Sequence, residues 1–165
     1  FREIYLPFLQ PGETNEMIST LGGGMGIRFA NDAIDRIHGL TGGHPFFTRQ
    51  FCSYLSERYV ERPLMVSVEA VESLVEPYLE IASKDFQEIV DRFSRDYPEE
   101  LEACVEVARA GGKMELSDLA AKSCGNVSLR HLLGYQVVAL DGKSVRLTME
   151  LMRRWLVRSG FADKQ

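Results

Sequence analysis

The stretch best suited to hold a ligand is Thr-Gly-Gly-His-Pro at residues 41–45, which interrupts two amphipathic segments. Glycine reaches the positive φ of a helix C-cap, and proline is tolerated in a first helical turn because its missing N–H needs no partner there. Helix punctuation therefore accounts for Gly42 or Gly43 and for Pro45. It leaves His44 without a role, since a residue before proline is only biased toward extended backbone. The break is both a helix boundary and a candidate ligand contact.

Other groupings of chemically active side chains are weak. The glycine-rich run at 22–26 lacks the Lys-Ser/Thr of a phosphate-binding loop, and no G-x-x-x-x-G-K-[ST] occurs in the chain. Asp35 and His38 can share a helix face, but two groups do not make a metal site. The remaining histidines, His44 and His131, are far apart in the sequence. We therefore predict no catalytic residue and no metal site.

The cysteines and the composition indicate a core-forming protein from a reducing compartment. Of the 165 residues, 45% are hydrophobic and 26% are charged, as in globular domains. Cys52, Cys104 and Cys124 are odd in number and show no ligand spacing, so we expect buried thiols and a cytoplasmic location. No apolar run is long enough to span a membrane. Because the sequence begins at Phe1, we expect it to be part of a longer protein.

The charge changes along the chain. Residues 1–92 carry 8 Lys/Arg and 14 Asp/Glu, whereas residues 93–165 carry 11 and 10. The change suggests two domains, residues 1–95 and 96–165, with a boundary near 94–100. The net charge of −5 argues against non-specific binding of nucleic acid by the whole chain.

The elements that must position the break are helices. We expect helices over 13–24, after Asn31-Asp32, after Pro45, and after the N-cap Ser67, with Pro77 kinking or restarting the last of them. A short exit strand or loop over 3–9 precedes them. Residues 1–95 should thus form a helical bundle.

The second domain has the layout of a winged helix-turn-helix. Helices are expected from Pro98, from Ser117 and from Ser128, followed by a β-hairpin about Asp141-Gly142. A final helix contains the only tryptophan, Trp155, which we expect to anchor that helix to the core. The predicted fold class is mostly α, with a small β-hairpin.

Taken in order, TGGHP on a helix pair, LRHLLGYQVV, the hairpin and RRWL resemble the C-terminal part of STAND-type, AAA-like P-loop ATPases, in their archaeal-ATPase-like branch. The similarity extends over nearly the whole chain. It implies a nucleotide-sensing lid and a winged-helix regulatory module of a signal-transducing nucleotide switch.

In that family the proline of a Gly-x-Pro motif packs near the adenine of ATP or ADP, which is bound with magnesium in the complete protein. The matching residues are Gly43, His44 and Pro45. The resemblance implies that the partner is an N-terminal P-loop domain of the same chain. Since the phosphate-binding sequence is absent here, this chain alone should not hydrolyse ATP.

One departure from the family lies after the hairpin. Some relatives place a phosphate-contacting histidine there, whereas Thr148 occupies roughly that position in this sequence. A phosphate contact from the winged helix is therefore in doubt, although the archaeal-like branch often lacks this histidine.

Two alternatives remain open: a DNA-binding winged-helix transcription regulator and a protein-interaction module. Five basic residues are candidates for contact with nucleic acid or with another domain: Arg130, Lys143, Arg146, Arg153 and Arg154. A domain with a net charge near zero is expected to bind DNA poorly, because affinity for DNA depends largely on neutralising its phosphates. We therefore expect Arg153 and Arg154 to be solvated or to pair with acidic groups such as those of the first domain.

Overall fold

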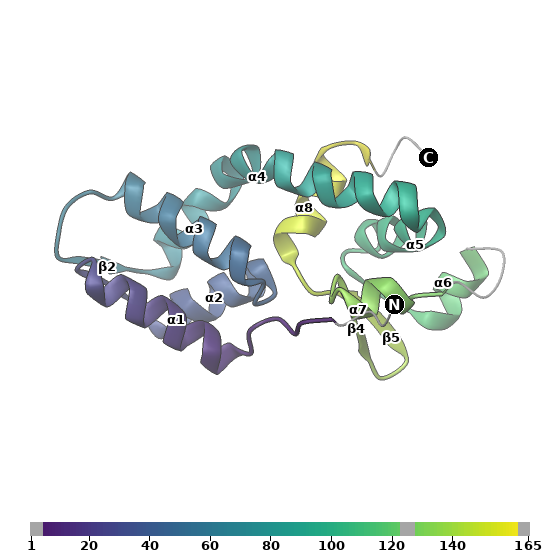
Figure 1. The fold of residues 1–165 in the computed structure, drawn as a ribbon, viewed down its shortest axis with the longest axis horizontal. Coiled ribbons are helices and arrows are strands. Elements are labelled where there is room, and N and C mark those ends of the chain that lie inside the picture. The colour runs from purple at the N-terminus through teal and green to yellow at the C-terminus, as the bar shows by residue number, and fades with distance from the viewer. Residues whose placement is uncertain (1–4, 123–127, 162–165) are drawn as a thin grey trace. The chain divides into compact units, whose positions relative to one another are not determined.

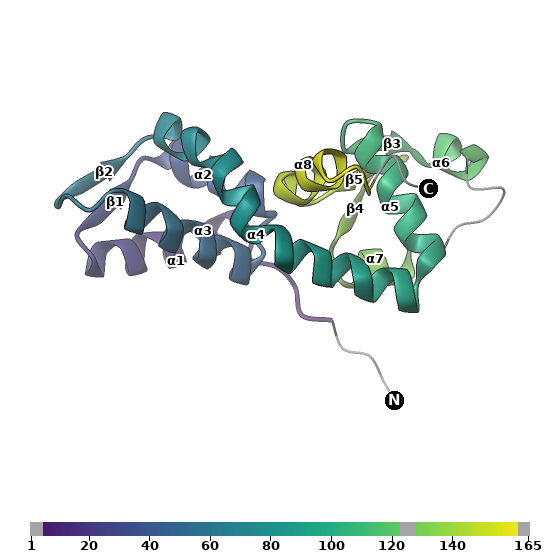
Figure 2. The ribbon, with the colours of Figure 1, turned by 90° about the horizontal axis from the view of Figure 1, so that it is seen from above.

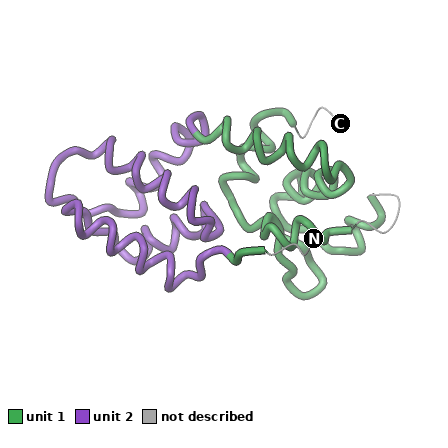
Figure 3. Tube along the Cα trace, viewed as in Figure 1, with its two compact units in different colours: residues 1–7, 82–165 green, residues 8–81 purple. Residues whose placement is uncertain are grey.

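In the computed structural model, which describes residues 5–122 and 128–161, the chain divides into two compact units (Figure 3). The helical unit comprises residues 8–81, and the winged-helix unit comprises residues 1–7 and 82–165. The boundary between residues 81 and 82 falls inside helix α4 (Val68–Asp96), whereas the sequence predicted a boundary between residues 95 and 96. The composition changes at the end of α4, but one continuous helix can supply apolar side chains to two cores.

The helical unit confirms the predicted helices of the first domain (Figure 1). Its helices are α1 (Pro11–Gly24), α2 (Asn31–Thr41), α3 (Pro45–Arg58) and the first part of α4. Helix α1 starts with a reciprocal cap, in which the Glu13 carboxylate accepts the Gln10 N–H at 2.7 Å. Helix α4 begins after Ser67, whose hydroxyl accepts the Ala70 N–H, and it continues through Pro77 without interruption.

The helical unit also contains a parallel pair of strands that the sequence did not predict. Strand β1 (Ile27–Phe29) pairs with β2 (Leu64–Val66) (Figure 2). A three-residue strand is too short to show the alternation by which strands are recognised. Helix α1 packs closely on β1 at Gly22, where an added Cβ would lie 2.9 Å from the Ile27 carbonyl oxygen. The glycine-rich run therefore serves close packing at this position.

The winged-helix unit confirms the predicted fold class. Its elements after α4 are α5 (Pro98–Arg109), β3 (Lys113–Glu115), α6 (Leu116–Lys122), α7 (Arg130–Gly134), β4 (Val138–Asp141), β5 (Ser144–Leu147) and α8 (Glu150–Arg158). The three strands form an antiparallel sheet in the order β3-β5-β4, so the wing has a third strand that the sequence did not predict. The hairpin turn lies at Gly142-Lys143, one residue beyond the predicted position, because Asp141 still pairs with Ser144.

Trp155 anchors the last helix, as predicted. Its side chain is buried, its Nε1–H donates to the Ser83 hydroxyl at 2.9 Å, and its ring lies 5.8 Å from that of Phe86. Both partners belong to the second part of α4, which explains why this part joins the winged-helix unit. Among the described residues, no helix combines the length and the apolar character needed to cross a bilayer.

Candidate functional site

The break between α2 and α3 is a tight turn built on two consecutive glycines. Gly42 and Gly43 have φ of 61° and 74°, the left-handed region that favours glycine. The His44 N–H then donates to the Thr41 carbonyl at 3.0 Å, and His44 occupies the N-cap position of α3, with Pro45 as its first residue. The predicted helix punctuation is confirmed, and both glycines supply the positive φ.

The segment that precedes α1 closes over this turn. The Leu9 N–H donates to the Gly43 carbonyl at 2.9 Å. A Cβ added to Gly43 would lie 2.1 Å from the Leu9 carbonyl oxygen and 2.9 Å from Cε1 of His38. The backbone at Leu9 therefore approaches Gly43 too closely for any side chain, so Gly43 is required by sterics as well as by its φ.

A pair of buried hydroxyls fastens the two helices on either side of the turn. Thr41 and Thr48 are both fully buried, and their Oγ1 atoms lie 2.9 Å apart. Thr41 Oγ1 also donates to the Ile37 carbonyl at 2.9 Å. The pair fixes the end of α2 against the first turn of α3, which gives the break one defined conformation. The sequence contained no signal for this pair beyond the two threonines themselves.

His44 points into the helical unit. Its ring lies 4.6 Å from that of Phe8 and 5.0 Å from that of Phe47, measured between centroids. Its Nδ1 atom is buried and has no hydrogen-bond partner among the described residues. Burial lowers the pKa of His44 below 6.5, because the charged imidazolium would lose its solvation. His44 is therefore a neutral ring packed among aromatic rings.

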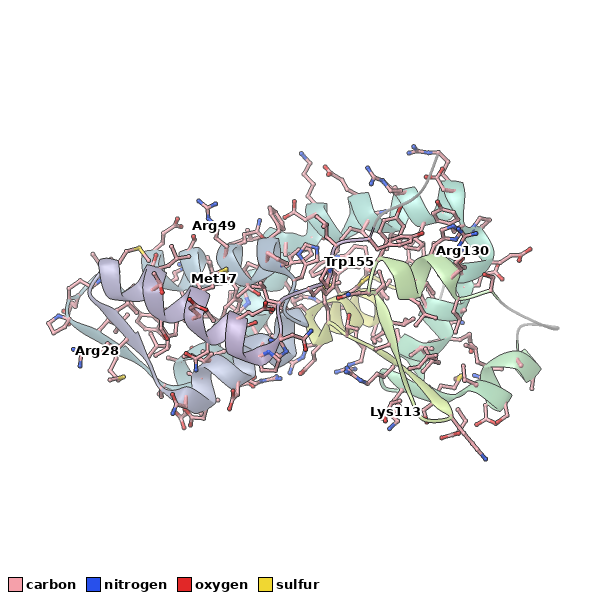
Figure 4. All side chains as sticks on the ribbon, turned by 60° about the horizontal axis from the view of Figure 1, so that its bottom comes forward. Met17, Arg28, Arg49, Lys113, Arg130 and Trp155 are labelled. Carbon is pink, nitrogen blue, oxygen red and sulfur yellow. The ribbon has the colours of Figure 1, made fainter. Side chains whose placement is uncertain are left out.

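The residues just after His44 face outward instead. Pro45 is exposed, and Phe46, which the sequence placed on or near the core-facing side of α3, is 50% exposed. Four residues after Pro45, and so on the same side of α3, Arg49 is also exposed and projects away from the ribbon (Figure 4). The start of α3 thus presents an apolar surface, Pro45 and Phe46, next to a positive charge.

The five predicted basic contact residues lie on different elements of the winged-helix unit. Arg130 begins α7, Lys143 lies in the wing turn, and Arg146 lies on β5 opposite Lys113 of β3. The remaining two belong to α8. The Arg154 guanidinium binds the Glu150 carboxylate at 2.6 Å in its own helix. Residues four apart on a helix are neighbours, so this pair forms within α8. Pairing of Arg153 or Arg154 with acidic groups of the first domain stays a prediction.

Arg153 lies against the turn that leads into β3. An added Cβ on Gly112 would lie 2.7 Å from its Cδ. Arg153 therefore packs its stem on the backbone of the wing.

Thr148, which stands near the place of the phosphate-contacting histidine, has a structural role. Its hydroxyl lies 2.5 Å from the Gln136 carbonyl oxygen and 3.1 Å from that of Val137. These bonds tie the end of the hairpin to the segment after α7. The hydroxyl is committed to the backbone, so this position offers a phosphate no ready contact.

A buried carboxylate that the sequence did not single out fixes α7. Glu100 of α5 is 5% exposed, and its carboxylate accepts the backbone N–H groups of His131 and Leu132 at 3.0 and 2.9 Å. It also lies 2.6 Å from Nδ1 of His131, whose ring stacks on Tyr97 at 3.7 Å. His131 is therefore part of the packing between α5 and α7. The Glu100 carboxylate accepts hydrogen bonds from backbone N–H groups in the first turn of α7, which have no partner within the helix.

The two described cysteines, Cys52 and Cys104, are not activated thiols. Burial raises the pKa of Cys52 and of Cys104 to about 12, so both stay protonated thiols. Cys124 lies outside the described residues. Within the part of the chain that the structure describes, no group of three or more His, Cys, Asp or Glu side chains could hold a metal ion.

No known family model matches the chain, and no curated protein sequence matches it. Among solved structures, it is similar to two variants of RuvB from Thermotoga maritima, with TM-scores of 0.45 and sequence identities of 17% and 16%. Each similarity covers 92% of this chain and 50% of RuvB, so the chain spans about half the length of that protein. These coarse similarities do not assign the chain to a family.

Proposed function

We propose that this chain is the nucleotide-sensing lid and winged-helix regulatory module of a STAND/AAA-like P-loop ATPase that acts as a cytoplasmic signalling switch. The observation that carries the proposal is the conformation of residues 43–46. The Gly42-Gly43 turn is covered by Leu9, and the His44 ring is held inward against Phe8. Pro45 and Phe46 face outward at the start of α3. An exposed proline and half-exposed phenylalanine suit a flat purine ring, which binds by apolar and aromatic contact.

The residues fit adenine but not the rest of a nucleotide. The sequence contains no phosphate-binding loop, and Thr148 donates its hydroxyl to backbone carbonyls. Phosphates and magnesium would therefore be held by the partner P-loop domain, which we place N-terminal to this module in the same protein. In this proposal Pro45 makes the adenine contact, while Gly43 and His44 set the turn that positions it.

The test uses the full-length protein and measures ADP and ATP affinity by titration calorimetry. Burying a proline ring removes some tens of Å² of apolar surface from water, worth about 1 kcal/mol. We therefore expect Pro45→Ala to weaken binding about fivefold and Phe46→Ala to act in the same direction. Pro77→Ala is the matched control, because Pro77 is exposed in the middle of α4.

Two results would count against the proposal. A gene that encodes no G-x-x-x-x-G-K-[ST] ahead of this module would leave Pro45 without a nucleotide to contact. Unchanged affinities in both Pro45→Ala and Phe46→Ala would remove the break from the nucleotide site even if a P-loop domain is present.

A further inference from the structure

The parallel strand pair of the helical unit has one covered face and one exposed face. Ile27 of β1 and Val66 of β2 are buried, whereas their neighbours Arg28 and Met65 are exposed, Met65 to 63%. Arg28 and Met65 are partners in the register, so their side chains stand side by side on one face. Parallel sheets are normally covered on both faces. The face that carries Arg28 and Met65 is therefore a candidate binding surface.

The outer edge of β2 is open. The Leu64 N–H donates to the Gly26 carbonyl at 3.0 Å, so Leu64 turns its backbone groups toward β1. Backbone groups of successive residues in a strand point to opposite edges, which directs the N–H and the carbonyl of Met65 away from β1. In the described part of the chain, these two groups make no hydrogen bond. A residue that offers both a donor and an acceptor at an edge is the unit with which an antiparallel strand pairs.

The outer edge of β1 is covered by α1. A Cβ added to Gly22 would lie 2.9 Å from the Ile27 carbonyl oxygen and 3.0 Å from the ring of Phe29. Helix α1 therefore occupies the space beside β1, and a new strand would join the pair at β2.

Exposed apolar side chains flank the strand pair in the sequence. Leu21 and Met25 lie at the end of α1, and Val60 precedes β2, with exposed fractions of 50%, 49% and 77%. The Arg62 Nε–H donates to the Met25 carbonyl at 3.1 Å, which ties the segment before β2 to the segment before β1. Exposed apolar groups that gather in one region mark interaction sites.

Arg28 determines the chemistry of the partner. Its side chain projects away from the ribbon (Figure 4), and it makes no ion pair with any described residue. In a strand added at β2, the side chain opposite Met65 lies on the face of Arg28, at two strand spacings or about 10 Å between Cα atoms. Arginine and glutamate side chains together span this distance. A second copy of the chain, paired antiparallel about Met65, would place another Met65 there and would leave Arg28 without a counter-charge.

We infer that β2 is a docking edge for an extended acidic segment of another protein, which joins the pair as a third strand and sets a carboxylate against Arg28. The backbone groups of Met65 provide two hydrogen bonds, and its side chain provides apolar contact. The inference does not depend on the proposed function, because it uses no residue of the break between α2 and α3.

An NMR titration of the isotope-labelled chain tests the inference, with a short capped peptide of alternating valine and glutamate as the probe. We expect chemical-shift changes centred on the amides of β2, with the Met65 amide proton moving downfield as it becomes hydrogen-bonded. The same peptide with lysine in place of glutamate should bind at least about threefold more weakly, because it cannot pair with Arg28.

Two substitutions separate the charge from the backbone. Arg28→Glu should weaken binding of the valine-glutamate peptide about threefold or more, whereas Arg92→Glu, the same charge change at an exposed residue of α4, should not. Met65→Pro should weaken it about fivefold, the effect of losing one hydrogen bond. Proline is tolerated there because the N–H it removes faces away from β1.

Three results would overturn the inference. The first is a set of shift changes that spares β2 or is equal for the two peptides. The second is unchanged peptide affinity in both Arg28→Glu and Met65→Pro. The third is self-association of the chain in sedimentation equilibrium without peptide that Met65→Pro abolishes, since that result would make a second copy the occupant of the edge.

Discussion

Replacement of Glu100 tests whether one buried carboxylate holds α7 in place. Its Oε2 atom accepts the backbone N–H groups of His131 and Leu132 at 3.0 and 2.9 Å, and its Oε1 atom lies 2.6 Å from Nδ1 of His131. Glu100→Ala leaves the His131 and Leu132 N–H groups buried without partners. A buried unsatisfied donor costs about 1–3 kcal/mol, so we expect a loss of about 3 kcal/mol in the free energy of unfolding.

Glu100→Gln separates charge from shape. The amide oxygen, in the place of Oε2, can still accept both backbone N–H groups, but it is neutral and accepts more weakly than a carboxylate, and the amide nitrogen that replaces Oε1 can only donate toward His131. We therefore expect an intermediate loss of about 1–2 kcal/mol. Urea denaturation followed by Trp155 fluorescence measures both changes, because Trp155 is buried in the same unit.

Glu99 provides the matched control, since it is the preceding residue of α5 and is exposed. Glu99→Ala should change the free energy of unfolding by less than about 0.5 kcal/mol. The reasoning is refuted if Glu100→Ala costs no more than Glu99→Ala, or if Glu100→Gln is as costly as Glu100→Ala. The first result would mean that water satisfies the two N–H groups, and the second that the remaining oxygen accepts nothing.

Three further predictions concern the helical unit and the thiols. Gly43→Ala should destabilise the protein by about 2 kcal/mol or more in thermal or urea unfolding, because the Cβ clashes with the Leu9 carbonyl, whereas Gly23→Ala, with open space around it, should not destabilise. Since burial lowers the pKa of His44, the unfolded state takes up a proton first as the pH falls through about 6.5, so the free energy of unfolding should decrease between about pH 7.5 and about pH 5.5. This decrease should be smaller in His44→Asn, and an equal decrease in both proteins would show that other groups cause it. In a Cys124→Ser variant, Cys52 and Cys104 should react with a thiol reagent at neutral pH only after the protein unfolds. Rapid reaction of the folded variant would contradict the raised pKa of these two thiols.

Much of the secondary structure could be predicted because its signals are local. The apolar spacing of α2, the proline at the start of α5 and the Asp-Gly of the wing are readable within a few residues. Helix termini were less accurate. Ser117 was predicted to cap a helix, yet α6 already begins at Leu116, because the chain turns directly from β3 into that helix.

What could not be read from the sequence depends on residues far apart in the chain. Strand β1 is defined by its pairing with β2, and β3 is defined by its pairing with β5. The same holds for the candidate site. The sequence identified Gly43, His44 and Pro45, but only the fold shows that Leu9 closes over Gly43 and that His44 turns inward while Pro45 faces outward.

The mostly helical class, the wing hairpin and the position of the break can be predicted from the sequence alone, because backbone propensity and hydrophobic periodicity act over short distances. Three features emerge only in the folded chain: which side chains at the break are exposed, where α4 passes from one core to the other, and which buried donors Glu100 satisfies. These outcomes depend on packing and on hydrogen bonds between distant segments, which arise only once the chain has folded.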